Sequence, residues 1–196
     1  MPADLAWKNR APKCRVFIGL WPEPALQQQL HALGVRCAKQ AGGRVIRPEN
    51  IHLTLVFLGN LLPAQIEAVR RIVSASAYEP VTIALDRIGY WRKPRIVWLG
   101  PAHPPDALIA YQARLAARLR KFGFRFDERP YKPHITLLRK AAHHPDLHAE
   151  PLVWQESRLA AAISVPTPAG VAYRLLDTAS AGTSAADGYE DAHRSE

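Results

Sequence analysis

The segment IHLTL at residues Ile51–Leu55 recurs, with two substitutions, as PHITL at Pro133–Leu137. Each copy places a histidine two residues before a threonine, with aliphatic residues between and after them. In a β-strand the side chains at positions i and i+2 point to the same face. His52 and Thr54 should therefore share one face of a strand. The aliphatic residues should be buried on the other face, so the copy presents an imidazole and a hydroxyl side by side.

The second copy predicts the same arrangement for His134 and Thr136. Two such strands facing each other across a groove would make a site with two histidines and two threonines. The unperturbed pKa of imidazole lies nearest neutral pH, so one histidine can take a proton while the other gives one. The hydroxyls can donate hydrogen bonds to the oxygens of an anion. This combination suits a phosphodiester with a poor alkoxide leaving group, and it requires no metal.

Other chemistries are less well supported by the sequence. A single His-x-Thr strand is typical of a half-buried core histidine, and it is the repetition that favours a site. Zinc needs three or four converging ligands, and threonine is not a usual one. His143, His144 and His148 form a loose group in a proline-rich loop, where solvated side chains are the more common outcome. Cys14 and Cys37 lie in no nucleophile motif. The sequence therefore predicts neither a metal nor a cofactor.

Composition is that of a soluble globular protein, with 48% hydrophobic and 22% charged residues among 196. No run of 18 apolar residues predicts a membrane span, and residues 1–13 lack the apolar core of a secretory signal. The two cysteines are expected to be free thiols in a reducing compartment, which indicates the cytoplasm. A net charge of +9 favours an anionic partner such as nucleic acid or a nucleotide.

Hydrophobic periodicity predicts an alternation of helices and strands. Strands are expected at residues 14–20, 51–58, 81–86, 96–100 and 134–138, with a hairpin formed by 159–165 and 171–176. Helices are expected from Pro24 to about Gly42, from Pro63 to about Ser74, and from Leu108 to Phe122. This order indicates an α+β or mixed α/β fold. We expect a flexible lead-in at 1–12, one bilobal domain at 13–178 and a disordered tail at 179–196.

Longer stretches around the two copies resemble a known family. They are RVFI at 15–18, NIHLTLVFLG at 50–59, GYW at 89–91 with RIVWLG at 95–100, and RPYKPHITLLR at 129–139. Together they resemble the 2H phosphoesterase superfamily. Within it they resemble the bacterial and archaeal RNA 2′,3′-cyclic phosphodiesterase branch, historically called 2′-5′ RNA ligase. The resemblance covers residues 14–140 well and the C-terminal hairpin more loosely.

The resemblance implies a bilobal α+β fold, in which two antiparallel sheets flank a central cleft and helices lie outside. It implies metal-independent hydrolysis of the 2′,3′-cyclic phosphate of RNA or a nucleotide to a 2′-phosphomonoester, with 2′-5′ ligation as the reverse reaction. His52 would be the general acid and His134 the general base, while Thr54 and Thr136 hold phosphate oxygens. The symmetry of the motifs also permits the opposite division of the two histidines.

Basic and aromatic residues near the motifs are candidates for holding RNA. Arg139, at the end of the second motif strand, is the leading phosphate-binding candidate, and its alternative is a solvated charge. Tyr131 and Trp91 are candidates for stacking on a base, with plain packing as the alternative for each. Lys132 and Arg95 could line the rim of an RNA-tracking cleft.

Two rival functions remain open at this stage. One is an RNA-binding module that keeps the fold without catalysis, and the presence of all four motif residues argues against it. The other is a related enzyme acting on a different cyclic or 2′-5′ phosphodiester. For either enzyme the expected partner is RNA or a nucleotide, without membrane or metal, and the expected state is a monomer.

Overall fold

A computed structural model describes residues 13–127, 129–148, 150–155, 157–168 and 170–179. The lead-in predicted at 1–12 lies outside these residues. So does the tail predicted at 179–196, apart from Ala179, which ends the last strand.

Three α-helices and one short 3₁₀-helix form in the described part of the chain. They are α1 (Pro24–Ala41), η1 (Pro48–Asn50), α2 (Pro63–Ser74) and α3 (Asp106–Lys121). The strands are β1 (Cys14–Pro22), β2 (Arg44–Val45), β3 (Leu53–Leu61), β4 (Ile83–Leu85), β5 (Arg87–Trp91), β6 (Ile96–Gly100), β7 (Ile135–Arg139), β8 (Leu152–Trp154), β9 (Ser157–Thr167) and β10 (Gly170–Ala179).

All predicted helices and strands are present, and β2, β5, β8 and the short η1 are additional. The sequence also predicts a basic loop at residues 91–95, and this prediction is wrong for Trp91, because that residue ends β5. The burial of β5 does not alternate cleanly, so periodicity gives little sign of it. Phe122 was expected on the buried face of α3, but the helix ends at Lys121 and Phe122 is 61% exposed.

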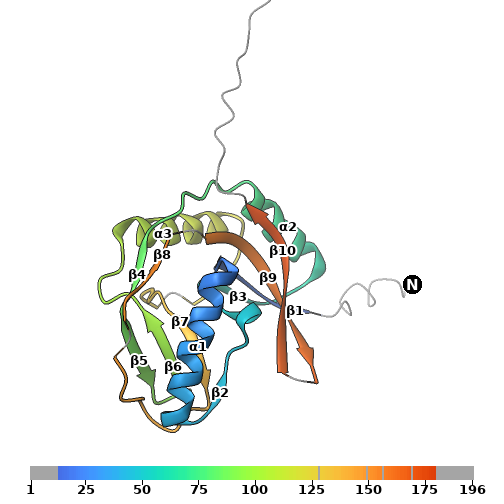
Figure 1. Cartoon of the computed structure of the whole chain (residues 1–196). Coiled ribbons are helices and arrows are strands. Elements are labelled where there is room, and N and C mark those ends of the chain that lie inside the picture. The colour runs from blue at the N-terminus through green and yellow to red at the C-terminus, as the bar shows by residue number, and fades with distance from the viewer. Residues whose placement is uncertain (1–12, 128, 149, 156, 169, 180–196) are drawn as a thin grey trace, which may run out of the picture.

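The strands form one large and one small antiparallel sheet, which confirms the α+β fold class. The large sheet has the order β10-β9-β1-β3-β7-β6-β5, with β2 pairing to β7, and the small sheet pairs β4 with β8. The two motif strands, β3 and β7, are neighbours in the large sheet, and one residue pair, Leu53 with Ile135, joins them. The sheet therefore has two halves, β10-β9-β1-β3 and β7-β6-β5, that meet at this pair (Figure 1).

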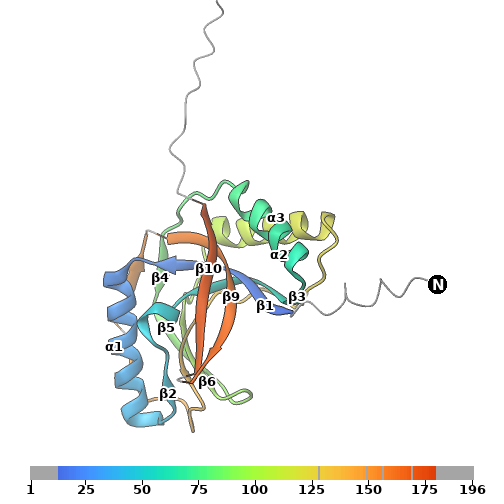
Figure 2. The same cartoon turned by 90° about the vertical axis from the view of Figure 1, so that its right-hand side faces the viewer.

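The predicted hairpin is the longest feature of the first half. β9 and β10 pair from Leu159 with Ala179 to Thr167 with Gly170. Figure 2 shows the two strands running side by side along the molecule. β9 also pairs with β1 over Arg15–Pro22, so the hairpin extends the half that carries the first motif.

A β-bulge interrupts the pairing of β1 with β3. Gly19 pairs with Thr54 but Ile18 pairs with Val56, which leaves Leu55 as an extra residue. A bulge of this kind shifts the alternation of side chains by one position. Leu55 and Val56 are both buried in consequence, and Phe57 rather than Val56 lies on the face of Thr54.

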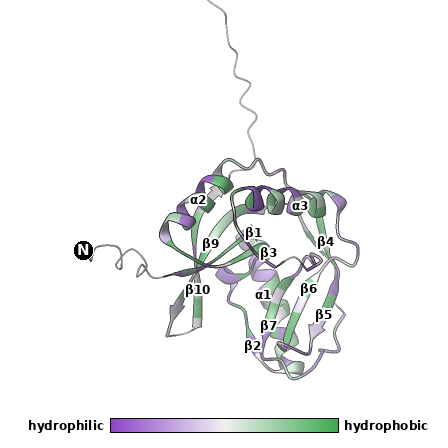
Figure 3. Cartoon of the chain, turned by 180° about the vertical axis from the view of Figure 1, so that it is seen from behind, coloured by the Kyte–Doolittle hydropathy of each residue, from purple (hydrophilic) through white to green (hydrophobic). Residues whose placement is uncertain are grey.

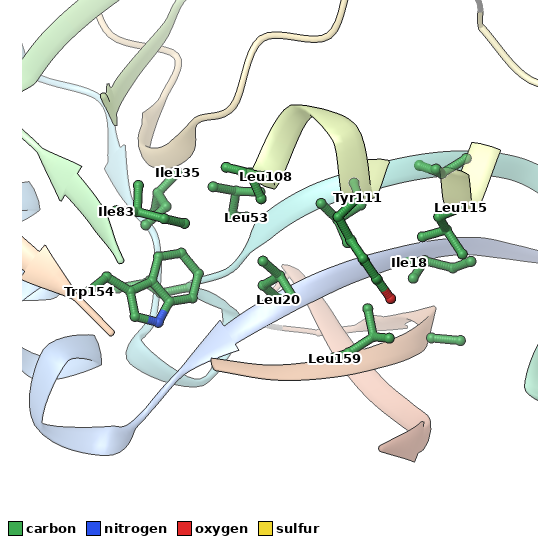
Figure 4. Close-up of a cluster of buried hydrophobic side chains, with 14 of the residues drawn as sticks. Ile18, Leu20, Leu53, Ile83, Leu108, Tyr111, Leu115, Ile135, Trp154 and Leu159 are labelled. Atoms are coloured by element: carbon green, nitrogen blue, oxygen red, sulfur yellow. The ribbon is translucent and has the colours of Figure 1, made fainter. Parts of the chain in front are cut away.

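The main core lies between the large sheet and the helices. In α1, the spacing i, i+4, i+7 and i+11 predicts one buried face, and the residues at these positions, Leu26, Leu30, Leu33 and Cys37, are all buried. Under α3, the buried side chains of Leu53 and Ile135 come together with Leu108 from the helix (Figure 4). Burial of these aliphatic residues fixes which face of each motif strand is turned away from the core.

Hydrophilic and hydrophobic residues alternate along α2 and α3 in Figure 3, as is typical of helices with one buried face. No helix among the described residues is long and apolar enough to cross a membrane. Cys14 and Cys37 are free thiols, as predicted.

Candidate active site

The first motif presents His52 and Thr54 on the face opposite the core. His52 directly precedes β3 and Thr54 is its second residue, while Leu53 and Leu55 are buried. Both polar side chains are half-buried, and Nε2 of His52 lies 3.1 Å from Oγ1 of Thr54. The shared face predicted from the i, i+2 spacing is therefore confirmed.

A backbone carbonyl orients the His52 ring. Nδ1 of His52 lies 2.7 Å from the carbonyl oxygen of Asn50, so Nδ1–H donates to that oxygen. Nε2 of the neutral ring is then an acceptor, and the Thr54 hydroxyl donates to it. Asn50 is held in turn, because its Nδ2 donates to the carbonyl of Val171 at 2.7 Å. The hairpin thus supports the segment that positions His52.

Aromatic rings surround His52. The ring centroids of Phe17, Trp21 and Tyr173 lie 4.7, 5.3 and 5.0 Å from that of the imidazole. Burial among these rings is the largest cause that lowers the pKa of His52 to about 4. The hydrogen bond to the Asn50 carbonyl acts in the opposite direction and raises the pKa. The positive charges of His134 and Arg139 lower this pKa further.

The second motif repeats the arrangement. Nδ1 of His134 donates to the carbonyl of Lys132 at 2.7 Å, and the rings of Trp91 and Trp98 lie 4.5 and 6.5 Å from the imidazole. Burial is the largest cause of a lowered His134 pKa, and the charge of Arg139 adds to it. The hydrogen bond to Lys132 acts in the opposite direction.

The joint between the two halves of the sheet brings the motifs together. Leu53 and Ile135 are direct partners, and both are buried. In an antiparallel pair centred on them, His52 lies across from Thr136 and Thr54 lies across from His134. All four side chains lie on the face opposite the core, because they alternate with the buried aliphatic residues. The predicted convergence of two histidines and two threonines is therefore what the fold produces.

A glycine on the neighbouring strand lies against each histidine segment. A Cβ atom on Gly19 of β1 would lie 2.8 Å from the carbonyl oxygen of Leu53 and 3.5 Å from Cδ2 of His52. A Cβ atom on Gly100 of β6 would lie 2.6 Å from the carbonyl oxygen of Pro133. We did not identify these glycines from the sequence. A glycine inside an apolar strand is the available signal, because it marks a close backbone approach.

The structure places the other predicted residues at different distances from the histidines. Arg139 is half-buried and its charge acts on both histidines, which fits a phosphate-binding role. Trp91 contacts His134. Lys132 holds His134 through its carbonyl, and its side chain is exposed. Arg95 is also exposed, in the turn between β5 and β6.

Tyr131 packs against the main core. Its hydroxyl is buried without a hydrogen-bond partner among the described residues, and burial raises the pKa of this tyrosine. This environment favours the packing alternative over base stacking.

The histidine-rich loop is exposed and its side chains contact backbone. Nδ1 of His143 lies 3.0 Å from the carbonyl oxygen of His144, and His148 is exposed. Within the described ranges, no three His, Cys, Asp or Glu side chains come together as metal ligands.

Comparisons with known proteins agree with this geometry. A family described as the 2′-5′ RNA ligase superfamily matches residues 22–165. An RNA 2′,3′-cyclic phosphodiesterase of Escherichia coli (strain K12) is 34% identical over 129 residues, which cover 65% of this chain and 73% of that protein. One from Thermotoga maritima is 27% identical over 83% of this chain and 92% of that protein. The crystal structure of E. coli LigT complexed with 3′-AMP matches with a TM-score of 0.73 and 27% identity. The match covers 85% of this chain and 97% of the LigT chain.

Proposed function

Because the chain belongs to the 2′-5′ RNA ligase superfamily, we propose that it is an RNA 2′,3′-cyclic phosphodiesterase. It hydrolyses the cyclic phosphate of an RNA end or nucleotide to a 2′-phosphomonoester. The observation that carries this proposal is the pair of imidazoles on one face. Each has its Nδ1 held by a backbone carbonyl at 2.7 Å, which leaves Nε2 for the substrate.

The two histidines divide the proton transfers. Nε2 of His134 takes a proton from the attacking water as its oxygen bonds to phosphorus. The P–O3′ bond breaks, and Nε2–H of His52 gives its proton to the departing O3′. Exchange with solvent then restores both protonation states. Ligation would run these steps in reverse with the roles of the histidines exchanged.

Thr54, Thr136 and Arg139 hold the non-bridging phosphate oxygens. When His52 is protonated, its Nε2 no longer accepts the hydrogen bond from Oγ1 of Thr54, and the threonine hydroxyl proton is then available to the phosphate. Arg139 adds a fixed positive charge near both histidines. This arrangement stabilises the negative charge on the non-bridging oxygens in the transition state.

The role of His52 as acid depends on the substrate itself. With a pKa of about 4, His52 is neutral at pH 7 in the free enzyme. A bound phosphate brings a negative charge beside both imidazoles, and an opposite charge at this range raises their pKa values. The anionic substrate therefore promotes protonation of the acid that it needs.

The proposal includes a metal-independent reaction, a monomeric state and a cytoplasmic location. The two histidines can supply both proton transfers without a Lewis acid, and the free thiols of Cys14 and Cys37 suit a reducing compartment. Trp91, Lys132 and Arg95 are proposed to contact RNA beside His134.

Product analysis tests the proposal. A 2′,3′-cyclic nucleotide is incubated with the enzyme in EDTA, and the phosphomonoester is identified by chromatography. We expect a 2′-phosphate at an undiminished rate. A 3′-phosphate would show that the other bond breaks, and loss of activity in EDTA would indicate a metal. An RNA-binding module without catalysis would give no product. Turnover of other cyclic or 2′-5′ phosphodiesters alone would indicate the related enzyme with a different substrate.

A further inference from the structure

We propose that the site extends past the terminal cyclic nucleotide along β1 and β3, where Phe57 and Arg15 bind the nucleotide immediately 5′ to it. This inference rests on the proposed function and deepens it. It makes an RNA strand, rather than a mononucleotide, the substrate to which the surface is fitted.

Phe57 is a large aromatic side chain that the core does not use. It is 47% exposed, although its neighbours Val56 and Leu58 are 3% and 5% exposed. The bulge at Leu55 carries Phe57 onto the same face as His52 and Thr54. With regular alternation from Thr54, the smaller Val56 would occupy that face.

Phe57 is continuous with the catalytic centre through one intervening ring. Its ring centroid lies 5.7 Å from that of Phe17, and Phe17 lies 4.7 Å from the imidazole of His52. Phe17 is buried, so it cannot offer a face to a base, whereas Phe57 can. Exposed aromatic rings in line with a phosphate site are the usual platforms for the bases of a single strand.

Arg15 supplies a cation at the outer end of this row. Arg15, Phe17 and Gly19 occupy alternate positions of β1 and therefore share a face. Gly19 lies against the His52 segment, and the guanidinium of Arg15 lies 5.8 Å from the centroid of the Phe57 ring. Arg15 is exposed, and no carboxylate in the described part of the chain forms an ion pair with it.

This order matches the order of groups in an RNA end. The cyclic phosphate lies at the histidines, the next base stacks on Phe57, and the phosphodiester beside that base meets Arg15. A guanidinium can bind phosphate oxygens through two N–H groups and can also pack on a ring. The net charge of +9 is consistent with a polyanionic ligand.

The test compares two substrates that end in the same cyclic nucleotide: the mononucleotide and a short oligoribonucleotide. For wild type we expect a higher kcat/KM with the oligonucleotide. Phe57→Ala should reduce the ratio of the two kcat/KM values about ten-fold, the usual scale for loss of one stacked base. Phe57→Tyr should keep the preference. Arg15→Gln should weaken the dependence of the oligonucleotide reaction on salt.

Phe122→Ala is the matched control, because Phe122 is 61% exposed at the end of α3 and belongs to neither motif strand. It should leave the ratio unchanged. If Phe57→Ala leaves the ratio of the two kcat/KM values unchanged, the subsite is overturned. An equal fall of kcat/KM on both substrates would then assign Phe57 a structural role. A wild type that hydrolyses both substrates equally would also overturn the subsite while the proposed function stands. A wild type that hydrolyses neither would overturn the proposed function itself.

Discussion

The two halves of the large sheet build the same histidine site with different surroundings. In both halves, Nδ1 of the histidine donates a hydrogen bond to the carbonyl oxygen of the residue two positions earlier, at 2.7 Å. In both, a glycine of the adjacent strand lies against the histidine segment. Around His52 lie Phe17, Trp21 and Tyr173, whereas Trp91 and Trp98 lie near His134. The backbone sets the position of each imidazole, and the side chains around it set its proton affinity.

The largest effect should come from removing either imidazole. His52→Ala and His134→Ala should each lower kcat for cyclic nucleotide hydrolysis by about 10²–10⁴-fold, the usual range for one general acid or base. Steady-state kinetics, with circular dichroism to confirm folding, measure this. Full activity in either variant would mean that the halves are not equivalent and that a single histidine does the work.

The residual activities separate the acid from the base. A general base must be deprotonated, so His52→Ala should gain activity as pH rises through the pKa of His134. A general acid must be protonated, so kcat/KM of His134→Ala should decline as pH rises through the pKa of His52, which lies above its wild-type value of about 4 because the charge of His134 no longer lowers it. The opposite slopes would assign the acid to the second half and the base to the first.

Arg139 acts on both halves at once, so its removal should affect both histidines. Arg139→Gln should lower kcat/KM by about 10–100-fold, the range for a lost hydrogen bond to a charged group. It should also raise the pKa of both histidines, because its charge lowers both. NMR titration of the imidazoles checks the shift. Arg125→Gln, which removes an exposed arginine just after α3 and outside the proposed site, is the control, and an equal effect from it would indicate general electrostatics.

The two glycines offer a smaller and matched perturbation. Gly19→Ala and Gly100→Ala would each bring a methyl group within 3 Å of a backbone oxygen, at Leu53 and Pro133 respectively. The backbone before or after each histidine must then shift, and a misplacement of this kind should lower kcat by roughly 10-fold or more. Kinetics are compared with urea unfolding, and a loss of stability at unchanged kcat would show that the glycines serve packing alone.

Stability should respond to pH mainly through the first half. The folded pKa of His52 is about 4 and its ordinary value is 6.5, so the unfolded chain binds more protons between these values. Stability should therefore fall as pH drops from 6.5 to 4, by up to about 3 kcal/mol at 1.4 kcal/mol per pKa unit. His52→Asn should remove more of this loss than His134→Asn in urea titrations. Equal relief would mean that the two imidazoles are equally desolvated.

Short-range sequence patterns predicted which side chains share a face of a strand or a helix. The spacing of His52 and Thr54 fixed their common face, and the stripe Leu26, Leu30, Leu33 and Cys37 fixed the buried side of α1. Both depend only on residues close in sequence.

Features that depend on distant segments could not be predicted in this way. Phe17 and Tyr173 meet at His52 because β1, β3 and β9–β10 are adjacent, and the bulge that exposes Phe57 is a property of the β1–β3 register. Tyr131, three residues before a motif histidine, packs against the core. Its side chain direction follows from the loop before β7 rather than from its distance in sequence to His134.

The single pair Leu53–Ile135 between the halves has a mechanical consequence. When one rigid body turns about a contact, each atom moves in proportion to its distance from that contact. His52 and His134 adjoin the pair, so a rocking of the halves displaces them least. Phe57 and Arg95 lie farther along their halves and sweep through larger arcs. If the halves rock about this pair, we expect the spacing between the two histidines to change less than the positions of groups at the periphery.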